Sequence, residues 1–190
     1  MQPNKLDKKT QKARKAIQDY AIGKEELSKS EIASYMARIM KNETVATAII
    51  LFAKVRNIHK LDDYIQKITI NIKEKYNALC LINYDDIPNR KHLLNIIYTS
   101  PEACFDLFIH TNASNKEKQN ALKQIIKKED IFIQLLKQNN LDLTIENKEF
   151  LKSYINNNEN LKHKLDYMKQ FLYDTDDSSP IIDNYNKIYS

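Results

Sequence analysis

The stretch that decides the fold runs from Ala13 to Met40 and reads ARKAIQDYAIGKEELSKSEIASYMARIM. It joins two apolar stripes of helical spacing through Gly23, the single glycine of the 190-residue chain. A glycine commonly ends a helix, and Ser28 followed by Glu31 is the capping box that begins one. Folds that hold nucleotides in a backbone loop need several glycines at positive φ, so one glycine excludes them. The sequence therefore predicts an all-α protein, folded as a compact multi-helix bundle.

Apolar residues continue at helical spacing along nearly the whole chain. Asn42 is placed to cap a strongly apolar helix that reaches Val55, and the pattern from Leu61 to Leu79 favours one further helix. After the polar loop at 83–89, the pattern predicts six short helices near residues 90–98, 101–111, 115–127, 129–138, 146–156 and 158–173. Ser100, Ser114 and Thr144 are placed to cap the second, third and fifth of these helices.

A faint repeat in the second half begins at Glu102, Glu129 and Glu159, with spacings of 27 and 30 residues. A helical hairpin has about this length. We therefore interpret the C-terminal half as stacked helical hairpins like those of an α-solenoid, with an irregular bundle as the alternative.

Charge sets the expected domain organisation. The net charge of +5 resides in the first 24 residues, and the last residues are acidic. We expect a basic N-terminal helix or arm at 1–24, one all-α domain at 25–173 and an acidic C-terminal segment with a short amphipathic helix at 174–190. The domain itself divides into two halves and a joining loop, at 25–82, 90–173 and 83–89.

The N-terminal helix carries the candidate contacts for nucleic acid or an acidic partner: Lys5, Lys8, Lys9, Lys12, Arg14 and Lys15. Lys8, Lys12 and Lys15 share one helix face at i, i+4 and i+7. Such a face suits a phosphate backbone or an acidic protein surface. The alternative is a frayed, solvated helix.

The C-terminal segment carries one apolar stripe, which is a candidate docking surface for a partner: Ile181, Ile182, Tyr185, Ile188 and Tyr189. Ser179 and Pro180 form a typical helix start before it. The stripe can dock on its own domain or enter a partner's groove, and a disordered segment is the third alternative.

The sequence offers no catalytic, cofactor-binding or metal-binding motif, and we expect no such site and no cofactor. Its four histidines are scattered, and none is followed by Asp. Cys80 and Cys104 lie in apolar sequence, which predicts two buried, reduced thiols. No apolar run is long enough to span a bilayer, so we expect no transmembrane segment.

These observations favour a non-enzymatic protein–protein interaction or adaptor module, cytoplasmic and bound to a protein partner. One alternative is a nucleic-acid-associated accessory protein that uses the basic N-terminal helix. Another is a secreted bacterial effector without a classical signal peptide, delivered to a host cell by a specialised secretion system. The abundance of Lys, Ile and Asn, which have A/T-rich codons, is typical of a low-GC genome.

Overall fold

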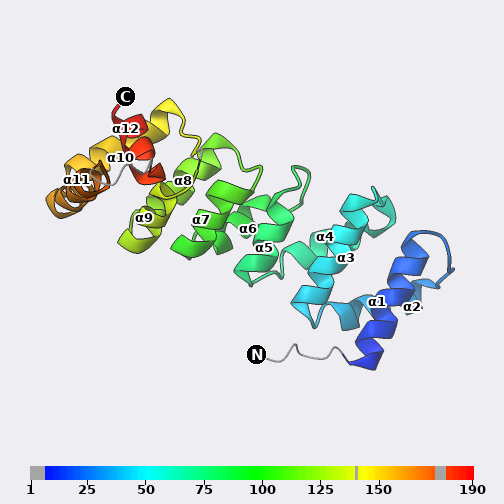
Figure 1. Cartoon of the computed structure of the whole chain (residues 1–190). Helices are drawn as coiled ribbons and strands as arrows, with labels where there is room; N and C mark the ends of the chain where they lie inside the picture. Colours follow the sequence, from blue (N-terminus) through cyan, green and yellow to red (C-terminus); the bar gives the residue numbers. More distant parts are fainter. Residues whose placement is uncertain (1–6, 140, 174–178) are drawn as a thin grey trace. The chain divides into compact units, whose positions relative to one another are not determined.

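The structure is a computed structural model that describes residues 7–139, 141–173 and 179–190. These residues form twelve α-helices and one 3-10 helix and contain no strand, which confirms the all-α prediction (Figure 1). They fall into two compact units, Met1–Ile97 and Tyr98–Ser190. Each unit has its own buried core and is described by itself.

Unit 1 contains six α-helices and the 3-10 helix: α1 (Lys8–Ala21), α2 (Lys29–Ile39), α3 (Glu43–Val55), η1 (His59–Leu61), α4 (Asp62–Thr69), α5 (Lys75–Ile82) and α6 (Arg90–Ile97). Helix α3 contacts α1, α2, α4 and α5 and is therefore central in this unit. Its side chains Ile49 and Ile50 are fully buried, as are Ile17 of α1, Leu81 of α5 and Leu93 of α6.

Local capping sequences begin and end the first helices as predicted. The Ser28 hydroxyl and the Glu31 carboxylate form the capping box of α2, and Asn42 Oδ1 accepts the Val45 amide of α3 at 3.1 Å. Gly23 follows α1 with φ +76°, the left-handed conformation that a glycine adopts without strain. These three caps satisfy helix-end groups that would otherwise lack a partner.

The single helix predicted from Leu61 to Leu79 is wrong, because two helices occupy that range and α4 ends at Thr69. The Thr69 hydroxyl donates to the Ile65 carbonyl at 3.0 Å. The Asn71 side-chain amide donates to the Lys67 carbonyl at 2.7 Å. Both side chains donate to carbonyls at the end of α4 that the amides of a further helical turn would otherwise satisfy. The helix can therefore end at this point.

A side chain from another helix fixes the start of α5. The Glu43 carboxylate, on the first residue of α3, accepts the backbone amides of Lys73 at 3.1 Å and Glu74 at 2.8 Å. It also accepts the Asn77 side-chain amide at 2.9 Å. The turn that precedes α5 is therefore held by a side chain 30 residues away, and this contact leaves no signal in the local sequence.

The loop at 83–89 is not the joint between the two halves of the chain, because it is tied into unit 1. Asn89, at φ +57°, donates its side-chain amide to the Gln66 carbonyl at 3.0 Å and to the Thr69 hydroxyl at 2.9 Å. Arg90 donates to the Ile82 carbonyl at 2.8 Å, at the end of α5. The division between the units lies instead at Ile97 and Tyr98.

Unit 2 contains six α-helices: α7 (Pro101–His110), α8 (Asn115–Ile125), α9 (Glu129–Leu136), α10 (Ile145–Asn156), α11 (Glu159–Tyr173) and α12 (Pro180–Tyr189). The predicted caps at Ser100, Ser114 and Thr144 all form. Helices α7 and α8 pack together as a hairpin, and α9 contacts both of them. The fully buried Phe132 of α9 meets the Tyr154 ring of α10 edge to face, with the ring centroids 5.9 Å apart.

The three glutamates of the faint repeat lie in the first turns of α7, α9 and α11. Glu102 forms an ion pair with Lys128, directly before α9, and Glu129 forms one with Lys164 of α11. The hydrogen bonds from Lys128 and Ser100 lower the pKa of Glu102 to about 2. Two of the three repeat glutamates thus form an ion pair with a lysine at or before the next odd-numbered helix, while stacking as a solenoid stays a prediction.

Candidate functional site

The predicted basic residues of α1 lie on the exposed side of a packed helix. Lys8, Lys9, Lys12, Arg14 and Lys15 are all exposed, and Lys5 lies outside the described residues. Within the described part of the chain, none of these five side chains forms an ion pair. Lys8, Lys12 and Lys15 follow one another along the helix face that is turned away from the core, so three cationic groups face solvent together.

Helix α1 holds this face rigidly, because both its start and its inner side are fixed. Asp7 Oδ1 accepts the backbone amides of Lys9 and Thr10 at 3.0 Å, and the Asp7 carboxylate pairs with Arg38 of α2 at 3.6 Å. The hydrogen bonds from Thr10 lower the pKa of Asp7. On the inner side, Ala13 is fully buried against the rest of unit 1. The helix is therefore part of unit 1 rather than a separate frayed arm.

The aromatic side chain of α1 is not presented for stacking. Tyr20 is half-buried, and the Lys60 ammonium lies over its ring, 5.2 Å from the centroid. Proteins that bind single-stranded nucleic acid commonly combine a basic groove with exposed aromatic rings. The α1 face offers the basic groups without such a ring.

The apolar stripe of α12 is covered by the chain's own helices. Ile181, Ile182, Tyr185 and Ile188 are each at most 8% exposed, and Tyr189 is half-buried. Helix α12 contacts α9, α10 and α11 within unit 2. Of the three alternatives for this segment, the structure shows the first: the stripe is docked on its own unit. It is therefore not a free surface for a partner.

Polar groups hold α12 in a defined register. The Asn184 side-chain amide, 1% exposed, donates to the carbonyls of Leu136 at 3.0 Å and Gln138 at 2.8 Å. These carbonyls lie at the end of α9, where helical partners are lacking. The Tyr185 hydroxyl donates to Asp166 of α11 at 2.8 Å. The docking is therefore specific as well as hydrophobic.

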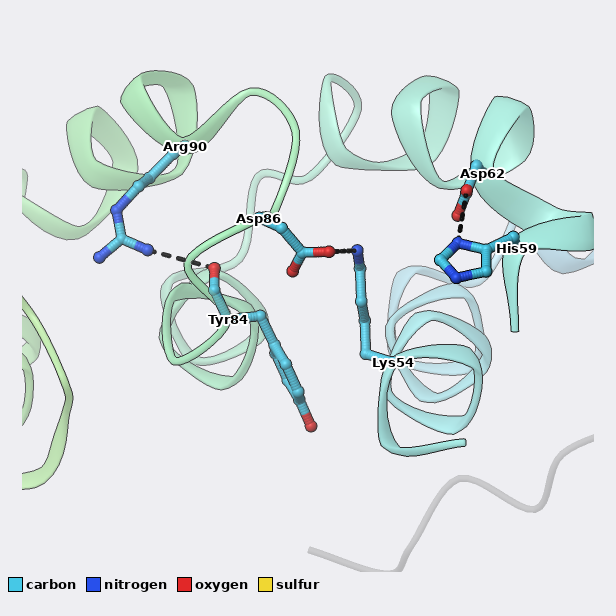
Figure 2. A network of polar contacts seen from close by, with 6 residues as sticks. All are labelled: Lys54, His59, Asp62, Tyr84, Asp86 and Arg90. Carbon is cyan, nitrogen blue, oxygen red and sulfur yellow. Dashed lines mark hydrogen bonds and ion pairs between the residues drawn. The ribbon is translucent and has the colours of Figure 1, made fainter. Parts of the chain in front are cut away.

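Unit 1 contains a network of polar contacts (Figure 2). Several of its residues line a hollow of about 270 Å³. Lys54 of α3 donates to the Asp86 carboxylate at 2.6 Å, and His59 Nδ1 lies 3.2 Å from Asp62 Oδ2. The hydrogen bond from Lys54 lowers the pKa of Asp86. Figure 2 shows Lys54 and Asp86 pointing toward each other, so this network ties the loop at 83–89 to α3.

A second hollow, of about 370 Å³, lies where two turns that are distant in sequence meet. One turn, Met40 to Asn42, joins α2 to α3, and the other, residues 70–74, joins α4 to α5. No pattern in the sequence predicted this hollow. The available signal was an apolar residue followed by lysine in each turn, namely Met40 before Lys41 and Ile72 before Lys73.

The two cysteines differ from the expectation of two buried thiols. Cys104 is fully buried in α7, and this burial raises the pKa of its thiol to about 12. Cys80 is exposed. In α5 the buried residues are Ala78, Leu79, Leu81 and Ile82, so Cys80 lies on the opposite side of the helix from the core. Apolar neighbours in sequence are not its neighbours in space.

This difference predicts selective thiol modification. At pH 8 a disulfide reagent such as DTNB is expected to react within minutes with Cys80 only, because the thiolate of Cys104 is both scarce and covered. Both thiols are expected to react in denaturant. Mass spectrometry locates the label, and Cys80→Ser, the control, is expected to abolish the fast phase. Fast labelling of Cys104 in the folded protein would contradict the assignment.

The histidines do not assemble into a metal site. In the described ranges, no group of three or more His, Cys, Asp or Glu side chains is arranged to hold an ion. His92 Nε2 lies 3.0 Å from the Ile72 carbonyl, and His110 and His163 are exposed.

No helix within the described residues has the length and hydrophobicity needed to cross a membrane.

The residues that stand out are therefore the basic face of α1 and the hollow between the two turns. No protein-family model matches the chain, and no curated protein and no solved structure matches it significantly, so its function is inferred from its own residues.

Proposed function

We propose that this protein is a non-enzymatic, helical interaction module of the adaptor type that binds an acidic protein surface through α1. The observation that carries the proposal is the exposed face of Lys8, Lys12 and Lys15 on a helix whose opposite side is buried. A rigid helix loses little conformational entropy when it binds, so its charges are available to a partner without prior ordering.

Charge complementarity favours an anionic partner. Side chains of like charge on one face repel one another, and a partner that supplies carboxylates removes this repulsion while it steers the encounter. Within the described residues, unit 1 supplies no carboxylate of its own to Lys8, Lys12 or Lys15. These three lysines therefore remain available to pair with carboxylates of a partner.

The composition of the face favours protein over nucleic acid. Arginine, which makes bidentate contacts to phosphate and guanine, is represented by Arg14 alone among the five described basic residues of α1. The α1 aromatic ring, Tyr20, is occupied by Lys60. The nucleic-acid-associated alternative rests on the i, i+4, i+7 spacing of the lysines, which can also follow a phosphate backbone.

The test compares the full chain with a charge-reversed variant, Lys8→Glu/Lys12→Glu/Lys15→Glu. Its matched control, Lys116→Glu/Lys123→Glu/Lys137→Glu, alters three exposed lysines of unit 2 and gives the same net charge. Each protein is used to capture partners from cells at low and high salt, with and without nuclease. We expect to capture a partner protein that is retained after nuclease treatment. The control is expected to capture as much of it as the unmodified chain, and the α1 variant at least tenfold less.

Two results would overturn the proposal. Capture that nuclease removes, and that falls steeply with salt, would assign the α1 face to nucleic acid. Equal capture by the α1 variant and the control would show that α1 is not the contact. Circular dichroism of both variants checks that the helices remain folded.

A further inference from the structure

The hollow between the α2–α3 turn and the α4–α5 turn combines an apolar base with a basic rim. Ala46, Ile68 and Ile72 line it and are at most 2% exposed, so they form its base. Met40, also in the lining, is 36% exposed, and Ile70 on the α4–α5 turn is 58% exposed. Apolar surface is therefore open to solvent at this point of unit 1.

The acidic group of this hollow has hydrogen-bond partners within the protein, whereas its basic groups form no ion pair within the described residues. Glu43 has both carboxylate oxygens occupied by the amides of Lys73, Glu74 and Asn77. Lys41 and Lys73 line the same hollow, their side chains are exposed, and neither forms an ion pair within the described residues. The rim therefore offers two positive charges, while the one carboxylate in the lining already accepts hydrogen bonds from the α4–α5 turn and from Asn77 of α5.

The size and chemistry of the hollow select its occupant. Its volume of about 370 Å³ lies at the lower end of the range of about 300–1,000 Å³ that is typical of ligand pockets. It suits one large side chain and its flanking backbone better than an extended cofactor. An occupant that satisfies both base and rim carries an apolar side chain next to carboxylates.

We propose that this hollow binds an acidic peptide segment of the partner, with one apolar side chain seated on the base and flanking carboxylates paired with Lys41 and Lys73. The inference rests on the proposed function, since it names the kind of segment that an acidic partner would present. It adds a second contact in unit 1 that differs from α1, because it selects for an apolar anchor as well as for charge.

The test uses two synthetic peptides of equal charge, acetyl-Asp-Glu-Leu-Asp-Glu-amide and the same peptide with serine in place of leucine. Affinities for the full chain are measured by fluorescence anisotropy with a labelled peptide. We expect the leucine peptide to bind about tenfold more tightly, because only leucine covers the apolar base. Higher salt is expected to weaken both peptides by the same factor.

Variants assign the binding to the hollow. Lys41→Glu/Lys73→Glu is expected to weaken both peptides about tenfold, and Met40→Ser to reduce the preference for leucine below threefold. The control Lys29→Glu/Lys91→Glu makes the same charge change at exposed sites of unit 1 outside the hollow and is expected to change either affinity less than twofold. In the unmodified protein, a peptide with a photoreactive leucine analogue is expected to crosslink to residues 40–46 or 68–73.

Equal affinities for the two peptides, or crosslinks confined to other segments, would overturn the inference. The two proposals fail in different ways. If the captured partner depends on α1 but the peptides do not discriminate, the hollow is not a peptide site and the proposed function stands. If the peptides bind the hollow but capture is insensitive to the α1 variant, the basic face fails as the contact while the hollow is retained.

Discussion

Replacement of Ile188 by aspartate is expected to release α12 from α9, α10 and α11 and to lower the free energy of unfolding of unit 2 by about 3–5 kcal/mol. Ile188 is 2% exposed, so an aspartate there would be a buried charge without a partner. Undocking of α12 from these three helices carries the charge into water. The cost is therefore limited by the free energy of docking.

The measurement is hydrogen exchange of the α12 amides together with urea unfolding of the full chain. In the unmodified protein the amides of α12 are expected to exchange slowly, and in Ile188→Asp they are expected to exchange at rates near those of a free peptide. Asn186→Asp introduces the same charge at an exposed position of the same helix and serves as the control. Equal exchange in the two variants would contradict the docking of α12 through its apolar stripe.

Replacement of Phe132 by alanine is the second change with a large expected effect, a loss of about 3–5 kcal/mol in the free energy of unfolding. Phe132 is fully buried, and its edge-to-face contact with Tyr154 joins α9 to α10. Alanine removes the contact and leaves a cavity that neighbouring side chains fill only in part. Tyr154 keeps its 2.7 Å hydrogen bond to the Ile126 carbonyl, which prevents its ring from moving far into the space.

Urea unfolding checks the magnitude, and hydrogen exchange checks the location. Exchange is expected to increase in α9 and α10 and to stay unchanged in unit 1, which has a separate core. Phe132→Leu leaves a smaller cavity and is expected to lower the free energy of unfolding by less than half as much. Gln134→Ala, at an exposed position of α9, is expected to lower it by less than about 0.5 kcal/mol. A loss below about 1 kcal/mol for Phe132→Ala would show that this position is not central to the core of unit 2.

The starts of five helices were predictable because a cap and its amide partners lie within a few residues of each other. Ser28, Asn42, Ser100, Ser114 and Thr144 all cap the helices that the sequence assigned to them. Helices α4, α5, α9 and α12 begin without a side-chain cap, and the turn before α5 is held instead by Glu43 from a different helix. A contact made across 30 residues cannot be recognised in a local pattern.

The candidate site was predictable only in part. The lysine face of α1 follows from helical spacing, because side chains at i, i+4 and i+7 lie on one side of any helix. The hollow beside Lys41 and Lys73 does not follow from spacing, since it forms only where two turns that are 30 residues apart in sequence meet. The exposure of Cys80 was missed for a related reason, because hydrophobic neighbours in sequence do not indicate which side of a short helix faces the core.

The sequence by itself determined that this protein is all-α and that its excess positive charge lies in the N-terminal residues. It also determined where most of the helices begin, because helix periodicity, capping and charge are local properties. Tertiary structure alone decided that α1 belongs to a folded unit, that α12 is docked, and where the turns meet. Those outcomes depend on which apolar faces cover one another and on side chains that satisfy backbone groups far away in sequence.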